Sequence, residues 1–166
     1  MIDIKTIDII FPGGYIPSMA WNVEYTDEFE AWWVGLDEEE QIDIAAVVGL
    51  LEEKGPHLPY PYSSDVKGTK FGAIRELRIQ HKGKPYRILY VFDPRRAAIL
   101  LIGGKKTGGA RWYEQYVPLA ERIYKEHLKS LKMNKGVHYE QTILYIEREN
   151  ETRSKKKSSG EDKDLT

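Results

Sequence analysis

Three strand-like runs, each separated from the next by a short turn, constrain the fold of this chain more than any other feature. They span residues 73–80, 85–92 and 97–102. The intervening segments, 81–84 and 93–96, carry glycine or proline and are short enough to be hairpin loops. The sequence therefore predicts an antiparallel meander of three strands.

Two helices are predicted before the meander because their ends carry recognisable signals. Thr26 is an N-cap candidate for a helix over residues 27–35. Asp37 opens a second helix, with Glu40 three residues later in capping-box spacing, and Gly55-Pro56 ends it. The expected buried stripe of this helix is Ile42, Ala45, Ala46, Val48 and Leu51. The two helices should form a hairpin laid across the sheet, with their acids on a solvated side.

One more strand and one more helix complete the predicted body. Residues 21–25 alternate apolar and polar side chains, while residues 113–131 repeat apolar side chains at spacings of three and four. The Pro-rich segment 56–64 is expected to be a connector. The expected order is β-α-α-β-β-β-α, an α+β fold with the helical hairpin packed on a small, mainly antiparallel sheet. The expected domains are an N-terminal extension (1–18), the folded body (19–132) and a largely disordered C-terminal extension (133–166).

Composition excludes several classes of protein. Cysteine is absent, and the four histidines show no ligand spacing. Disulfides, thiol nucleophiles and a metal cofactor are therefore not expected. No apolar run is long enough for a membrane span, so the expected location is cytoplasmic.

The charge is strongly polarised along the chain although the formal net charge is only −1. Residues 62–112 hold twelve Lys or Arg and three acids, a net charge of +9. Residues 24–53 hold eleven acids and no Lys or Arg. A basic block on strands indicates a sheet face directed at a polyanion, and the acidic block indicates the solvated back of the same domain.

Cations and aromatic residues in the basic block are candidates for one convergent face. They are Arg75, Arg78, Arg87, Lys105, Lys106, Arg111, Trp112 and Tyr113. Single-stranded RNA offers phosphates to arginine and unstacked bases to aromatic rings. RNA cleavage needs a base near the 2′-hydroxyl, cations around the phosphate and an acid for the 5′-oxygen, and lysine and tyrosine are able to supply the base and the acid.

Each of these residues also has a purely structural interpretation. Charges in turns, such as Lys82 and Lys84, are commonly just solvated, and His81 at a hairpin tip is expected to be exposed. From the pattern alone, Arg78 and Arg87 are as readily structural as functional. An arginine inside so apolar a strand as that of Arg87 predicts an open face. The glycine-rich loop 103–109 does not match a phosphate-binding P-loop.

Several short runs, in a fixed order, carry a family resemblance. They are Lys67-Gly68, Arg75–Arg78, Pro85–Phe92, Ile99–Lys106 and Ala120–Tyr124. Over residues 19–131 the chain resembles the RelE/ParE toxin superfamily, with the HigB-like, phage-derived toxins as the nearest group. The resemblance implies a toxin encoded beside an antitoxin, expected to be a helix-turn-helix protein. It also implies metal-independent cleavage of mRNA on the ribosome by attack of the 2′-hydroxyl on the adjacent phosphate.

The resemblance assigns expected roles to individual residues. Arg78 and Arg87 match arginines of the family's E-L-R and Y-R-x-L-Y runs and are expected to stabilise the phosphate and the transition state. Lys106 is the expected base, and Tyr113 is an acid or stacking candidate, although the family's Arg-x-x-x-Tyr ending is not reproduced. The expected RNA-binding residues are Lys67, Lys70, Arg75, Lys82, Lys105, Arg111 and Trp112.

Two other functions remain open from the sequence. The same basic face suits a non-catalytic module that binds RNA or protein, because a fold does not determine a function. A ParE-like gyrase inhibitor is the other alternative.

Overall fold

The computed structural model describes residues 20–70, 73–93 and 95–134. The predicted N-terminal extension (1–18) and residues 135–166 of the predicted C-terminal extension lie outside these ranges. The described residues up to Tyr124 belong to one compact unit, and those from Lys125 onward belong to a second. Within the described ranges, no helix has the length and apolar content that crossing a membrane requires.

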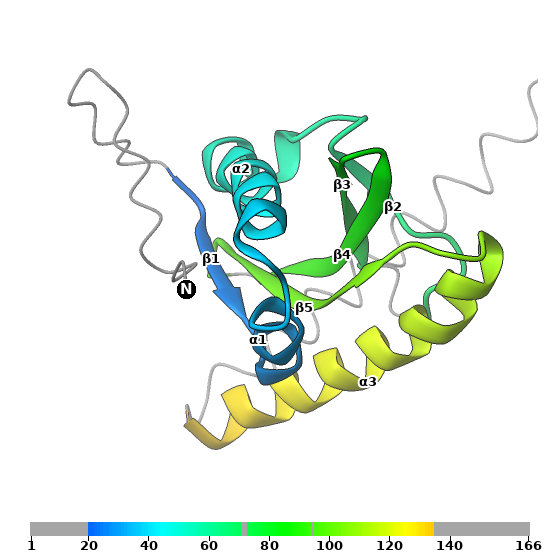
Figure 1. Ribbon diagram of the computed structural model, residues 1–166. Helices are drawn as coiled ribbons and strands as arrows, with labels where there is room; N and C mark the ends of the chain where they lie inside the picture. Colours follow the sequence, from blue (N-terminus) through cyan, green and yellow to red (C-terminus); the bar gives the residue numbers. More distant parts are fainter. Residues whose placement is uncertain (1–19, 71–72, 94, 135–166) are drawn as a thin grey trace, which may run out of the picture. The chain divides into compact units, whose positions relative to one another are not determined.

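Five strands form one sheet in the order β1-β5-β4-β3-β2 (Figure 1). The strands are β1 (Asn22–Tyr25), β2 (Ser63–Asp65), β3 (Arg75–His81), β4 (Lys84–Asp93) and β5 (Ala97–Lys105). β1 runs parallel to β5, and all other neighbouring strands are antiparallel. The α+β class and the meander, which is β3-β4-β5, are therefore confirmed.

The segment predicted as a connector contains two short elements that the sequence analysis missed. A 3-10 helix covers Gly55–His57, and β2 covers Ser63–Asp65, so the order is β-α-α-β-β-β-β-α. β2 has no apolar residue, and hence no alternation to reveal it. Its pairing partner is β3, where Ser63 lies opposite Leu77 and Asp65 opposite Arg75.

The predicted helix starts are confirmed by their caps. The Thr26 hydroxyl accepts a hydrogen bond from the backbone N–H of Phe29 at the start of α1 (Asp27–Trp33). α2 (Glu38–Lys54) begins with a complete capping box between Asp37 and Glu40. These local side-chain bonds satisfy N–H groups that the helix itself leaves unpaired.

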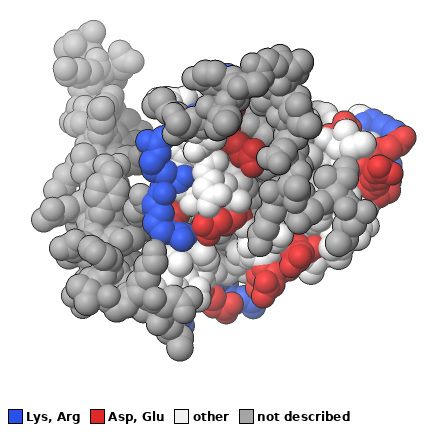
Figure 2. Space-filling view, turned by 90° about the vertical axis from the view of Figure 1, so that its left-hand side faces the viewer, with Lys and Arg blue, Asp and Glu red and all other residues white. Residues whose placement is uncertain are grey.

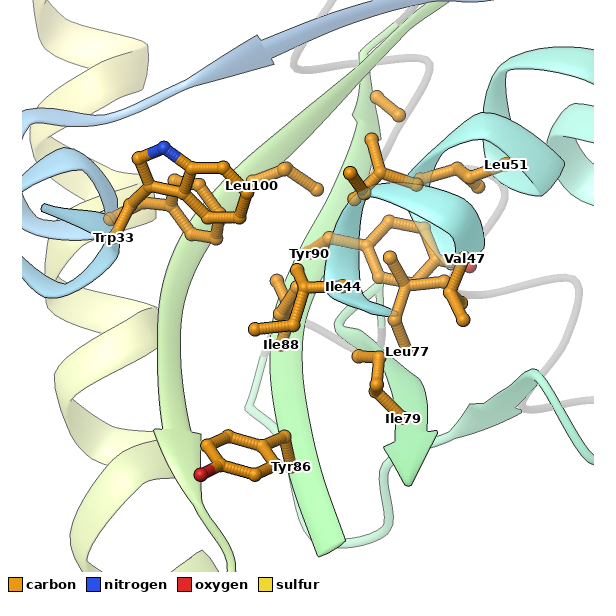
Figure 3. Packing of buried hydrophobic residues seen from close by; sticks show 14 of the residues in the cluster. Trp33, Ile44, Val47, Leu51, Leu77, Ile79, Tyr86, Ile88, Tyr90 and Leu100 are labelled. Atoms are coloured by element: carbon orange, nitrogen blue, oxygen red, sulfur yellow. The ribbon is translucent and has the colours of Figure 1, made fainter. Parts of the chain in front are cut away.

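The main apolar core lies between the helical hairpin and the sheet (Figure 3). α1 contributes Trp33, and α2 contributes Ile44 and Leu51, which pack with apolar residues of β3, β4 and β5. Two residues of the predicted stripe are misplaced, because Ile42 is 52% exposed and Ala46 is also exposed. The buried residues of α2 are instead Gln41, Ile44, Ala45, Val47, Val48 and Leu51.

Two adjacent glycines in β5 let helices approach both faces of the sheet. A Cβ at Gly103 would lie 2.1 Å from the Trp32 ring of α1, and a Cβ at Gly104 would lie 2.9 Å from the Tyr116 ring of α3 (Ala110–Asn134). Successive strand residues point to opposite faces. The part of α3 around Tyr116 therefore covers the face opposite the helical hairpin.

The acidic side of α2 contacts the tip of the β3-β4 hairpin. Three pairs make these contacts: Lys82 with Glu39, Tyr86 with Glu40 and His81 with Asp43. We call these six residues the hairpin-tip cluster. His81 is only 5% exposed, so the prediction of an exposed histidine is wrong. The acidic block is therefore not simply a solvent-exposed side of the domain, since Glu39, Glu40 and Asp43 all bind residues of the basic segment.

Candidate functional site

Two arginines lie directly opposite each other on neighbouring strands. Arg78 of β3 pairs with Arg87 of β4, and Arg87 in turn pairs with Gly104 of β5. Directly paired residues project from the same face, here the one that carries the Tyr116 ring. Two like charges in this position repel each other, so the arrangement requires a compensating anion.

Glu76 supplies that negative charge. It is 4% exposed and projects from β3 on the same face as Arg78. Its Oε1 accepts hydrogen bonds from Ser64 Oγ and Arg78 Nη1, both at 2.9 Å. Its Oε2 accepts a 2.7 Å hydrogen bond from the Tyr113 hydroxyl and lies 3.7 Å from Arg87 Nε. We call Glu76, Ser64, Arg78, Arg87 and Tyr113 the Glu76 cluster.

Arg87 is buried, which corrects the prediction that it needs an open face. It is 3% exposed, and its Nη1 donates to the carbonyl of Tyr86 at 2.9 Å. Its Nε has no hydrogen-bond partner. A buried charge is costly unless it is paired, so Arg87 depends on the nearby carboxylate of Glu76. Arg78, with a side chain that is 27% exposed, is the arginine that solvent reaches.

Tyr113 links the sheet to α3 and brings Lys106 to the cluster. Burial and the hydrogen bond to Glu76 both raise the pKa of the Tyr113 hydroxyl, so it keeps its proton at neutral pH. The Lys106 Nζ lies 4.8 Å from the centroid of the Tyr113 ring, a cation–π contact. The Lys106 backbone N–H donates to the carbonyl of Pro85, which fixes the start of the loop after β5.

The first turns of α3 are held by aromatic packing. Trp112 is 3% exposed, and its ring stacks on Tyr116 with centroids 4.3 Å apart and planes 7° from parallel. Tyr116 in turn lies over Gly104, where any larger residue would clash. Trp112 thus sits under the surface and helps to position Tyr113.

The structure brings together the four residues expected to be catalytic but not all of those expected to bind RNA. Arg78, Arg87, Lys106 and Tyr113 are joined through Glu76 and the Tyr113 ring. Arg75 pairs with Tyr90 on the opposite face of the sheet and binds Asp65 and Ser63. Lys82 belongs to the hairpin-tip cluster. The other expected lysines and Arg111 are exposed: Lys67, Lys70, Lys105 and Arg111.

Glu76 is the functional candidate that sequence analysis missed. In the sequence it stands only as one of three acids in a basic block. The signal was present in the alternation of β3, since Glu76 and Arg78 share one face and are two residues apart. Tyr113 completes the set from a position 37 residues away from Glu76, and no local pattern predicts that contact.

Acidic and basic side chains are interleaved on the folded chain although they are separated along the sequence. On the face shown in Figure 2, Lys and Arg side chains form a short column directly beside acidic side chains. Arg95, for example, binds both Asp93 and Glu24. Among the described residues, no group of three His, Asp or Glu side chains is placed to hold a metal ion.

The fold and the site define a small α+β protein with a buried carboxylate–arginine–tyrosine cluster beside an accessible lysine. Residues 31–125 match the model of the phage-derived Gp49-like protein family (DUF891). The chain belongs to this family.

Two relatives from Mycobacterium tuberculosis are named as toxins. The chain is 36% identical to HigB3 over 104 residues, which cover 62% of this chain and 90% of HigB3. It is 35% identical to HigB2 over 120 residues, which cover 71% of this chain and 59% of HigB2. The chain thus spans less than two thirds of the length of HigB2. The predicted HigB-like, phage-derived group is confirmed.

Solved structures with some similarity include two of Escherichia coli proteins. The isolated RelE toxin aligns with a TM-score of 0.43 and 14% identity, covering 57% of this chain and 94% of RelE. A chain of the RelBE toxin–antitoxin complex aligns with a TM-score of 0.42 and 13% identity, covering 54% of this chain and all of that one.

Proposed function

We propose that this chain is the toxin of a type II toxin–antitoxin pair and an endoribonuclease that cleaves mRNA on the ribosome without a metal ion. The observation that carries the proposal is the Glu76 cluster with Lys106 at its edge. It combines a partly exposed arginine, a buried second positive charge and a protonated tyrosine within one set of contacts. The names of HigB2 and HigB3 support the role of a toxin.

In the proposed reaction, the phosphorus exchanges its bond to the 5′-oxygen for a bond to the 2′-oxygen. The 2′-hydroxyl loses its proton to a base, for which Lys106 is the candidate, and its oxygen attacks the adjacent phosphorus. The bond from phosphorus to the 5′-oxygen breaks, and that oxygen takes a proton from Tyr113. The products are a 2′,3′-cyclic phosphate and a free 5′-hydroxyl.

The two arginines have different proposed roles because their exposure differs. Arg78 is accessible and is placed to contact the phosphate directly. Arg87 is buried, so its proposed role is indirect. Its charge stabilises the negative charge that develops on the phosphate without touching it, and its ion pair holds Glu76 in place. A fixed charge in a low-dielectric environment stabilises a transition state strongly because little solvent screens it.

Inducible expression in growing cells tests the proposal. Expression should arrest growth, and co-expression of the adjacent open reading frame, if it encodes a small helix-turn-helix protein, should relieve the arrest. Arg78→Ala and Lys106→Ala should each relieve it without loss of folding, since both side chains are accessible. Lys84→Ala, at the exposed first residue of β4, is the matched control and should remain toxic.

The position of RNA ends separates this function from the alternatives. Primer extension on a translated message should reveal cuts in phase with codons. A non-catalytic binding module would arrest growth without cuts, and a gyrase inhibitor would induce DNA-damage signalling while messages stay intact. Full toxicity of both Arg78→Ala and Lys106→Ala would contradict the assigned site.

A further inference from the structure

An exposed tyrosine lies directly against the accessible arginine of the site. Tyr60 is 72% exposed, the largest exposure among the large apolar side chains described. The Arg78 guanidinium carbon lies 5.3 Å from the centroid of its ring. The Arg78 guanidinium group therefore donates to Glu76 through Nη1 and also lies over the exposed ring of Tyr60.

The loop that carries Tyr60 is tethered on both sides. Leu58 before it is buried in the core, and Ser63 after it is buried with its hydroxyl 2.7 Å from that of Tyr90. Between them, the Pro59 carbonyl accepts hydrogen bonds from two backbone N–H groups, those of Tyr62 and Ser63. The exposed ring is thus presented from an ordered frame.

Burying an aromatic ring stabilises a folded protein, but the Tyr60 ring is mostly exposed and contributes little of this stabilisation. The adjacent cation gives its ring a defined position beside the proposed phosphate contact. Unpaired RNA bases stack on such rings, and stacking tolerates any base because every base has a flat π-face.

We propose that Tyr60 is a base-stacking subsite for the nucleotide next to the phosphate held by Arg78. This inference rests on the proposed function, because it takes the RNA phosphate to lie at Arg78. The ligand is single-stranded RNA. The two other nitrogens of the Arg78 side chain, Nε and Nη2, form no hydrogen bond among the described residues, so both remain available to phosphate oxygens.

Equilibrium binding of a short labelled RNA tests the subsite on the purified chain. The probe is a single-stranded hexanucleotide with 2′-O-methyl groups, which cannot be cleaved, and fluorescence anisotropy reports binding. Tyr60→Leu should weaken binding by roughly 5- to 100-fold, the usual range for loss of one stacked base. Tyr60→Phe keeps the ring and should bind within about twofold of the original chain.

Abasic probes separate stacking from an indirect effect on Arg78. A set of hexanucleotides, each lacking one base, should contain one member that binds the original chain and Tyr60→Leu equally. If Tyr60→Leu instead weakens binding to every abasic probe as much as to the intact one, the ring acts through Arg78 and the subsite is refuted. Because Tyr60 is mostly exposed, its replacement leaves no cavity in the core.

Arg78→Ala distinguishes failure of the subsite from failure of the proposed function. If Arg78→Ala loses RNA binding while Tyr60→Leu binds RNA normally, the phosphate contact is supported and the stacking subsite is refuted. If neither substitution changes RNA binding, the proposed function falls as well. If Tyr60→Leu keeps RNA binding but no longer binds the protein encoded by the adjacent reading frame, the ring contacts an antitoxin and the RNA assignment is wrong.

Discussion

The hairpin-tip cluster and the Glu76 cluster contain similar chemistry in different surroundings. Each combines acidic and basic side chains with a tyrosine hydroxyl that donates to a carboxylate. In the hairpin-tip cluster, the side chains of Lys82 and Glu39 are 64% and 66% exposed. In the Glu76 cluster, Glu76 and Arg87 are 4% and 3% exposed.

This difference in burial determines what each cluster does. The exposed Lys82–Glu39 pair exchanges easily with water and ions, so it contributes little energy, although His81 and Tyr86 of the same cluster are buried. In the buried cluster, one carboxylate serves two guanidinium groups, a hydroxyl of Ser64 and the hydroxyl of Tyr113. Removing Glu76 leaves the buried Arg87 charge and the Tyr113 hydroxyl without their partner. Burial therefore makes the Glu76 carboxylate structurally essential and gives its surroundings a defined chemistry.

The largest expected effect follows from removing the shared carboxylate. Glu76→Ala leaves Arg87 buried without a counter-charge and Tyr113 without its acceptor. The free energy of unfolding should fall by about 3–5 kcal/mol. Urea unfolding followed by circular dichroism measures this change.

Glu39→Ala is the matched control in the hairpin-tip cluster. It removes a carboxylate from an exposed pair, so the urea midpoint should stay almost unchanged. Equal unfolding midpoints for Glu76→Ala and Glu39→Ala would show that burial does not distinguish the two clusters.

Replacing the Tyr113 hydroxyl tests whether the buried Glu76 cluster takes part in catalysis. If Tyr113 protonates the leaving oxygen, Tyr113→Phe should slow cleavage of a translated message by about 100-fold or more. The pKa of Tyr113 is raised by burial and by Glu76, so activity that needs its proton should persist beyond the usual tyrosine range and then fall as the pH rises further. Rates of cleavage measured against pH provide this test.

Tyr116→Phe is the control for Tyr113→Phe. It keeps the ring that stacks on Trp112 and should leave the cleavage rate unchanged. A Tyr113→Phe variant that cleaves as fast as the original chain would remove Tyr113 from the acid role.

A smaller effect is expected from the tyrosine of the hairpin-tip cluster. The Tyr86 hydroxyl donates to Glu40, and this bond with burial raises its pKa to about 12. Its stabilising contribution is complete below the ordinary tyrosine pKa of about 10 and is lost as the pH rises through the folded-state value. Tyr86→Phe should therefore lower the free energy of unfolding by roughly 1 kcal/mol at neutral pH.

The difference between the original chain and Tyr86→Phe should shrink as the pH rises from about 10 towards 12. Urea midpoints of both proteins across this range provide the measurement. A difference that stays constant would mean that the hydrogen bond to Glu40 does not control the titration of Tyr86.

The parts of the structure that depend on neighbouring residues could be predicted from the sequence. Thr26 and the Asp37–Glu40 capping box act within three residues, and their observed bonds match the pattern. The β3-β4-β5 meander follows from short turns. Ile42 was placed in the core wrongly because the apolar stripe of α2 admits more than one rotation, and only packing against the sheet selects one.

The candidate site was predictable in its residues but not in its organisation. Arg78, Arg87, Lys106 and Tyr113 were identified from type and resemblance. Strand alternation places Arg75 on the face away from Arg78, because the two residues are three positions apart. The sequence does not predict the role of Glu76, because that role depends on contacts with Ser64, Arg87 and Tyr113, which are distant in sequence.

The sequence by itself determined the element types, the helix caps, the strand pairing of the meander and the family, because these depend on local spacing and residue type. Only the tertiary structure decided that Arg87 is buried, that Glu76 is shared by two arginines and a tyrosine, and that Tyr60 stands beside Arg78. The physical reason is that burial and long-range pairing arise when β2, β3, β4 and α3 pack together. A charge acquires its chemical role from the groups that replace water around it.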